Sequence, residues 1–185
     1  LTFMLKRSTF DNLLKHAGNN DLLGQMSGKL LSNLAERCIE MGAAVVVIKC
    51  GYLGAYIRTA GRKLLENIGV AKPGNIQNWT EREIFEPSFQ ISNMVSATGS
   101  GDNAIAGFLA AYLHKLDVED ALRFLCAVGA HNVQVPDAIS GVKSWKQTSD
   151  EIQSGWLKND IDISLDGWKY DSEAKHYLGP NDKTP

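Results

Sequence analysis

Residues 96–102 read Ser96-Ala97-Thr98-Gly99-Ser100-Gly101-Asp102, and a helical pattern of apolar residues follows at once. The apolar residues recur at the spacing of one buried helix face, at Ile105, Phe108, Leu109, Tyr112 and Leu113. A glycine-rich turn before a helix exposes backbone N–H groups at the positive end of the helix dipole, and both favour an anion such as phosphate. The stretch therefore predicts an anion-binding turn that opens a helix packed against the core.

Asp102 stands in the first turn of this predicted helix, where a carboxylate has two ordinary roles. It can cap the helix by accepting hydrogen bonds from free backbone N–H groups. Alternatively, if a phosphate binds beside it, Asp102 can take the proton from an attacking hydroxyl. The local pattern leaves both roles open, and a turn with a cap is the commoner of the two.

The whole chain has the composition of an ordinary globular domain. Its 185 residues are 44% hydrophobic and 22% charged, and a net charge of -2 without a basic cluster argues against nucleic acid as a partner. The longest apolar run, Ala43 to Ile48, is too short to span a membrane, and no signal peptide pattern is visible. Three widely spaced cysteines, Cys38, Cys50 and Cys126, indicate reduced thiols in a cytoplasmic protein, without a disulfide framework or zinc site.

Helical and strand patterns alternate along the chain as in a layered α/β domain. Continuous apolar residues from Ala43 to Cys50 predict a strand that is buried on both faces, as in a sheet covered by helices. Two further strands are expected at 55–59 and 89–95, around an excursion of loop and hairpin at 61–86. Helices are expected at 29–41, 102–115, 118–132 and 144–156. We therefore predict an α/β fold with helices flanking a mostly parallel sheet.

The two ends of the chain differ from this pattern. From Leu157 to Pro185 no apolar period survives, so we expect an irregular C-terminal tail on the surface. The chain begins at Leu1, and its first six residues are apolar enough to continue a helix begun earlier. We therefore expect that the N-terminal part of the fold is absent from this chain.

Several separated motifs resemble those of the ribokinase-like (PfkB) carbohydrate kinases. Thr98 to Phe108 is similar to the second signature of that family, Asp-Thr-x-Gly-Ala-Gly-Asp followed by a helix with a Gly-Phe step. Ala43 to Gly54 resembles the family's strand and Gly-x-x-Gly turn, which touches the nucleotide. The spacing from Gly54 to Gly99 fits the family's hairpin excursion. The resemblance covers residues 1–156 and implies the C-terminal part of a ribokinase-like kinase domain, with residues 157–185 as a tail.

The resemblance also implies roles for individual residues. Asp102 matches the catalytic base, and the backbone amides of Gly99, Ser100 and Gly101 match the anion hole for the transferring phosphoryl group. The implied nucleotide-binding residues are Lys49, Gly51, Gly54, Cys126 and Asn132. A solvated lysine and a core cysteine remain equally good interpretations of Lys49 and Cys126. The implied substrates are ATP with Mg²⁺ and a small sugar, no protein residue is predicted to bind a metal, and a homodimer is compatible with the family.

Two departures from the family pattern limit what the resemblance implies. Ser96 replaces the first aspartate of the signature, which in relatives often helps to hold a monovalent cation, so we expect weaker dependence on potassium. The N-terminal half, which supplies most sugar contacts and the lid in the family, has no counterpart here. We therefore expect the chain alone to be inactive.

Two alternatives to a sugar kinase remain at this point. One is a kinase of the same fold that acts on a nucleoside or a vitamin precursor. The other is a non-catalytic nucleotide-binding or regulatory module that retains the scaffold. Asp102 argues against the second alternative, because such a module has no need of that carboxylate. The chain has no Gly-x-x-x-x-Gly-Lys-Ser/Thr sequence, which excludes a P-loop kinase.

Overall fold

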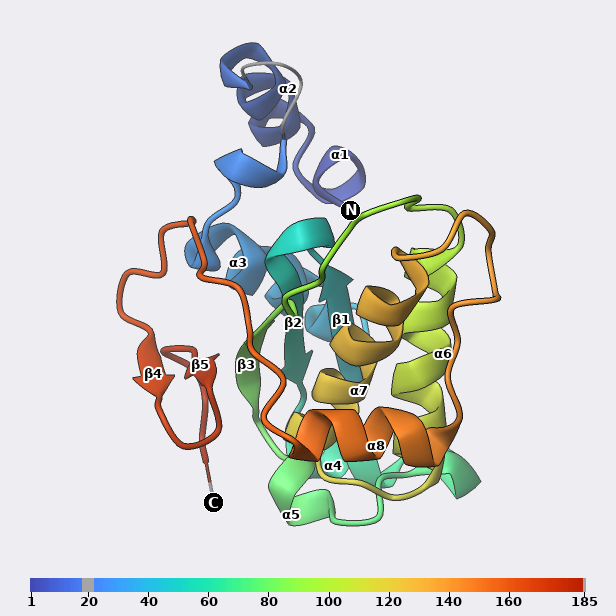
Figure 1. Ribbon diagram of the computed structural model, residues 1–185. Helices are drawn as coiled ribbons and strands as arrows, with labels where there is room; N and C mark the ends of the chain where they lie inside the picture. Colours follow the sequence, from blue (N-terminus) through green and yellow to red (C-terminus); the bar gives the residue numbers. More distant parts are fainter. Residues whose placement is uncertain (18–21, 185) are drawn as a thin grey trace.

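The computed structural model describes residues 1–17 and 22–184, and within them one antiparallel sheet forms the centre of the fold (Figure 1). The sheet has five strands in the order β1-β2-β3-β5-β4. These strands are β1 (Val45–Lys49), β2 (Gly54–Thr59), β3 (Glu83–Pro87), β4 (Lys169–Asp171) and β5 (His176–Leu178). The first three form a meander, and the last two add a hairpin beside β3.

The pairing of β1 with β2 corrects the prediction of a mostly parallel sheet. Val47 lies opposite Ile57, and Lys49 lies opposite Ala55, in antiparallel register. Little more than the short 3-10 helix η3 (Gly51–Leu53) joins the two strands, whereas a parallel pair needs a crossover of about a dozen residues or more. The continuous apolar character of β1 therefore reflects burial on both faces, which also occurs in an antiparallel sheet covered by helices.

Side chains of the sheet alternate between two apolar clusters, one on each face. Ile57 and Ile84 belong to one cluster, while Tyr56 and Phe85 belong to the other. All four side chains are fully buried. The sheet is thus the middle layer of an α/β fold, as the sequence predicted.

Two long helices, α6 (Ser100–Leu113) and α7 (Val118–Asn132), cover one face of the sheet, and α8 (Trp145–Gln153) packs on α7 (Figure 1). A Cβ on Gly107 of α6 would lie 2.8 Å from Val128 Cγ2 and 2.9 Å from the Phe124 carbonyl oxygen. The helices approach closely because the buried face of α6 consists mainly of small residues. Its buried residues are Ala104, Gly107, Phe108 and Ala111. The expectation that Leu109 and Leu113 lie on the buried face was wrong, since they are 50% and 64% exposed.

The opposite face of the sheet is covered by α3 (Gly28–Glu40), which contributes Leu31 and Ala35 to the cluster around Tyr56. Figure 1 shows α1 and α2 above the sheet and α4 and α5 below it. The shorter elements are α1 (Thr2–Leu5), α2 (Arg7–His16), η2 (Leu23–Gln25), α4 (Arg62–Glu66), η4 (Gly69–Ala71) and α5 (Ile76–Trp79). Among the residues described, every helix is too short or too polar to cross a membrane.

The third strand lies at Glu83–Pro87, inside the region where a loop and hairpin were expected. The strand predicted at 89–95 does not form, and that stretch contributes an isolated bridge between Phe89 and Lys158. The apolar pattern did not indicate β3 because two of its residues, Glu83 and Glu86, belong to a polar residue type and are nevertheless completely buried. Met94 and Val95 are apolar residues that are 62% and 49% exposed.

Residues 157–184 form part of the sheet and its surroundings, which corrects the prediction of an irregular tail; Pro185 lies outside the described residues. Asn181 donates to Glu83 Oε2 from its backbone N–H at 2.8 Å and from Nδ2 at 2.9 Å. Arg82 Nε donates to Asp182 Oδ2 at 3.0 Å. Because Arg82 and Glu83 are at most 1% exposed, this segment supplies partners to charges inside the molecule.

Candidate active site

The stretch 98–101, which we call the glycine turn, makes the tight entry into α6. Gly99 occupies the N-cap position with φ 72°, in the left-handed region. A Cβ at Gly99 would lie 2.5 Å from the Ala138 carbonyl oxygen and 2.7 Å from its Cα. Both the backbone conformation and the lack of space therefore require glycine at this position.

The backbone N–H groups of the glycine turn differ in their hydrogen bonding. Ser100 N–H donates to the Ala97 carbonyl at 3.2 Å, and Asp102 N–H donates to the Gly99 carbonyl at 3.1 Å. The N–H groups of Gly99 and Gly101 have no hydrogen-bond acceptor among the described residues. Of the three predicted anion-hole amides, Gly99 and Gly101 are thus open to an anion at the positive end of the α6 dipole.

Asp102 is exposed and is the third residue of α6. Its carboxylate forms no hydrogen bond or ion pair with any residue that the structure describes. The N-cap is Gly99, and no side chain caps this helix end. The contacts therefore give no support to a capping role, and they leave the carboxylate accessible beside the open amides, where it can accept a proton.

Lys49, the last residue of β1, brings a positive charge to the glycine turn. Its Nζ donates to the carbonyl oxygen of Gly101 at 2.9 Å. The side chain is exposed, so this contact leaves the ammonium accessible to a ligand. The structure thus brings together Lys49, Gly101 and the neighbouring Asp102, to which the resemblance assigned separate roles.

Asn132 and Ser96 support the glycine turn from the inside. Asn132 is fully buried at the end of α7, and its Nδ2 donates to the Thr98 carbonyl at 2.9 Å. The hydroxyl of Ser96 accepts from Thr98 N–H at 3.1 Å. Both residues hold the turn in place, and the expected weak dependence on potassium stays a prediction.

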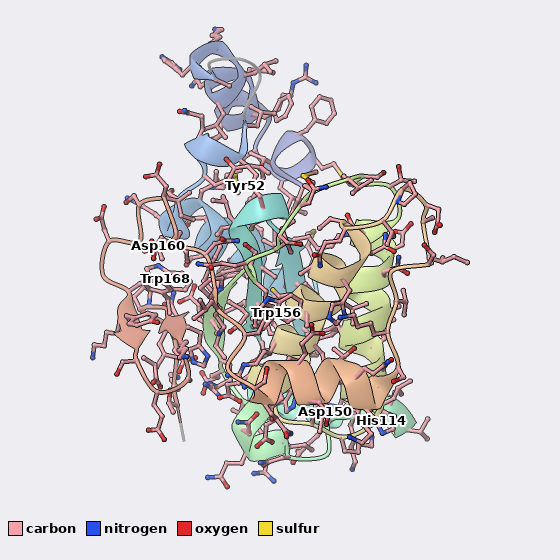
Figure 2. The ribbon with its side chains drawn as sticks, in the orientation of Figure 1. Tyr52, His114, Asp150, Trp156, Asp160 and Trp168 are labelled. Atoms are coloured by element: carbon pink, nitrogen blue, oxygen red, sulfur yellow. The ribbon has the colours of Figure 1, made fainter. Side chains whose placement is uncertain are left out.

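A second glycine turn follows β1 and lies at the same end of the sheet as the start of α6 (Figure 1). Gly51 has φ 56° and Gly54 has φ 122°, and a Cβ at Gly54 would clash with the Glu86 carbonyl oxygen. Tyr52, labelled near the top of Figure 2, marks this turn and is 58% exposed. Of the two predicted nucleotide-binding glycines, Gly51 is therefore exposed shortly after Lys49, whereas Gly54 is buried at the start of β2.

Cys126 lies apart from these exposed turns. It is 7% exposed in the apolar cluster under α7, and its thiol contacts the Glu86 carbonyl oxygen at 3.7 Å. Burial raises the pKa of this thiol well above its usual value. We assign Cys126 to the core and leave it out of the candidate site.

No group of three or more His, Cys, Asp or Glu side chains that could hold a metal ion occurs among residues 1–17 and 22–184. The described residues near Asp102 thus provide no carboxylate cage for Mg²⁺.

The order and geometry of these motifs agree with a match to a known family. The model of the pfkB family carbohydrate kinases matches residues 16–145. This chain belongs to the PfkB carbohydrate kinase family. The matched residues include Lys49, both glycine turns, Asp102 and Asn132, so the resemblance inferred from the sequence is confirmed.

Individual PfkB relatives are similar over part of their length. An uncharacterized sugar kinase of Archaeoglobus fulgidus is 32% identical over 108 residues, which cover 58% of this chain and 35% of the relative. The structure of Arabidopsis thaliana ribokinase complexed with ribose and ATP matches with a TM-score of 0.52 and 23% identity, over 70% of this chain and 37% of that one. The chain thus spans about a third of the length of these relatives.

The sequence assigned no role to one contributor to this PfkB site, Asn103. Asn103 Nδ2 donates to the carbonyl oxygen of Ala138, and Ala138 packs directly against Gly99. The one local signal was a polar residue in an otherwise apolar part of α6, directly after Asp102. Nothing in the sequence pattern indicated that its partner would be a backbone carbonyl 35 residues further along the chain.

Proposed function

We propose that the whole protein of which this chain forms part transfers a phosphoryl group from MgATP to a hydroxyl of a small sugar. The observation that carries this proposal is the exposed, unpaired carboxylate of Asp102 beside two open backbone amides and the ammonium of Lys49. Membership of the carbohydrate kinase family supports the same reaction class. The sugar and the hydroxyl that it offers remain to be found by experiment.

Each of these groups has a separate part in the proposed reaction. Asp102 accepts the proton of the attacking hydroxyl, which makes the oxygen a better nucleophile. The N–H groups of Gly99 and Gly101 donate to the oxygens of the transferring phosphoryl group, and the α6 dipole favours their negative charge. Lys49 adds a positive charge at the end of β1. Catalysis then consists of positioning and electrostatic stabilisation, without a covalent enzyme intermediate.

Replacing Asp102 by Asn tests this role in the full-length protein. Asn is nearly isosteric but cannot accept a proton at neutral pH, and loss of general-base assistance costs on the order of 100- to 10,000-fold in turnover. Because the carboxylate forms no contact with described residues, unfolding free energy should change by less than about 1 kcal/mol. The measurement is sugar-dependent ADP formation at saturating substrate, together with urea denaturation.

Asp120→Asn is a control for turnover, because Asp120 is the third residue of α7 just as Asp102 is the third residue of α6, although Asp120 pairs with Arg123 at 2.8 Å. The control variant should keep wild-type turnover. Turnover of Asp102→Asn within about threefold of wild type would return Asp102 to a structural role and remove the basis of the proposed mechanism. A panel of sugars, nucleosides and vitamin precursors identifies the substrate, and binding of ATP without any turnover would identify a non-catalytic module.

A further inference from the structure

Residues 133–142, which we call the adjoining loop, follow α7 and lie against the glycine turn. Ala138 of the adjoining loop occupies the space beside Gly99 where a side chain would otherwise stand. The loop has its own internal support, because Asp137 Oδ1 accepts from the N–H groups of Ile139 at 2.9 Å and Ser140 at 2.7 Å. A turn and a loop far apart in the sequence therefore share one packed contact.

Residues on either side of the glycine turn donate hydrogen bonds to the adjoining loop. At the near end, the N–H groups of Val95 and Ser96 donate to the Val133 carbonyl at 2.8 and 3.2 Å. At the far end, Asn103 Nδ2 donates to the carbonyl oxygen of Ala138. The near end is held by backbone groups, whereas the hydrogen bond at the far end comes from one side chain of α6.

Helix geometry explains why Asn103 faces the loop while its neighbour stays accessible. Successive residues of an α-helix point about 100° apart around the axis. Asp102 is exposed, and the half-buried side chain of Asn103 reaches the adjoining loop. The first turn of α6 thus carries the carboxylate of Asp102 on one side and, on another side, the amide of Asn103 that binds the loop.

We propose that Asn103 is a positioning residue, which holds the adjoining loop on the glycine turn so that the two segments form one rigid wall for ATP. The inference rests on the proposed function of this site. Asn103 acts through Ala138 and the loop and does not itself touch the reacting groups. Its loss frees the far end of the loop, which must then be ordered again each time ATP binds, so affinity for ATP falls more than the rate of the chemical step.

The experiment compares Asn103→Ala with Asn103→Gln in the full-length protein. In Asn103→Ala the KM for ATP should rise about three- to tenfold, the range that corresponds to the net contribution of one hydrogen bond. The kcat should stay within about twofold. Asn103→Gln keeps an amide donor and should return KM to within about twofold of wild type. Hydrogen exchange without ATP should become faster at residues 95–101 and 133–141 in Asn103→Ala.

Asn78→Ala is a matched control at the other end of the molecule. Asn78 lies on α5, at the bottom of Figure 1, and its Nδ2 donates across to Glu119 at 2.9 Å. This variant also removes an amide that links two elements, so it reports on general loss of stability. It should leave the KM for ATP and the exchange of residues 133–141 unchanged.

The outcomes separate this inference from the proposed function. Unchanged exchange at 95–101 and 133–141 in Asn103→Ala overturns the positioning role, as does an unchanged KM or a loss confined to kcat. An Asn103→Gln variant as impaired as Asn103→Ala also overturns it. Hydrogen exchange needs no turnover, so a wild-type protein inactive on every acceptor refutes the kinase proposal while exchange still decides whether Asn103 couples the two segments.

Discussion

His176 is 2% exposed, and its Nδ1 lies 3.8 Å from Oε2 of Glu86, which is also buried. Burial, together with the nearby ammonium of Lys158, lowers the pKa of His176 from 6.5 to about 4. Burial also raises the pKa of Glu86 to about 7, against the opposing effect of Lys158 and Arg123. Two groups that burial favours in the neutral form, one on β5 and one on β3, thus face each other.

The two groups give stability opposite dependences on pH. The depressed pKa of His176 means that its contribution is complete above pH 6.5 and is lost as the pH falls toward 4, because the unfolded chain binds the proton first. The raised pKa of Glu86 makes the folded form less stable as the pH rises from 4.5 to about 7. Replacement of one group at a time separates these effects.

We predict that His176→Gln removes the loss of folding stability that protonation of His176 causes at acid pH. As the pH falls from 7 to 4, the unfolding free energy of wild type should decrease relative to that of the variant by on the order of 2 kcal/mol. Urea denaturation at several pH values measures this difference. A curve for His176→Gln that runs parallel to the wild-type curve would show that His176 titrates alike in the folded and unfolded states.

At the scale of whole elements, the sequence predicted the helices and strands that carry a pattern of apolar residues within their own range. The helices α3, α6, α7 and α8 and the first two strands formed close to their expected ranges, because each carries its own apolar period. β3 was missed because its buried glutamates receive partners from residues far along the chain, such as Asn181. A pattern of apolar residues cannot show a strand whose buried charges are neutralised by distant segments.

The candidate site shows the same division between local and distant signals. Gly99 and Asp102 stand in one short signature, and Lys49 belongs to a second, so both could be read from the chain. The contact between Asn103 and Ala138 could not, because a side chain bonded to a backbone carbonyl leaves no trace in the partner's residue type. Burial of Cys126 depends on helix packing that one sequence does not specify.

The packing of α6 on α7 gives a prediction at this scale. Gly107→Val places methyl groups where a Cβ already comes within 2.8 Å of Val128 Cγ2, and overpacking of this kind costs about 1–3 kcal/mol. We expect a lower urea midpoint with an unchanged m-value. Ala106→Val on the exposed side of the same helix should cost about 0.5 kcal/mol, as helix propensity alone predicts. Equal losses in the two variants would contradict the close packing of the helices.

At the scale of the whole molecule, the chain corresponds to about a third of its relatives' length. We predict that residues 1–185 alone form no ADP in response to any sugar, because the resemblance assigns most sugar contacts and the lid to the family's N-terminal half. The assay compares this chain with its Asp102→Asn variant over a sugar panel. Sugar-dependent ADP formation above that variant would show that the site is complete without further residues.

The long reach of the C-terminal hairpin also sets the order of events during folding. The meander β1-β2-β3 and the α6–α7 pair join neighbouring stretches, while the contact of Glu83 with Asn181 closes a separation of 98 residues. Contacts that close short loops form first, since long closures cost more chain entropy. Until residues 158–182 pack against β3, Glu83 lacks Asn181 and Glu86 lacks Lys158 as partners. We therefore expect this C-terminal segment to join the sheet late in folding.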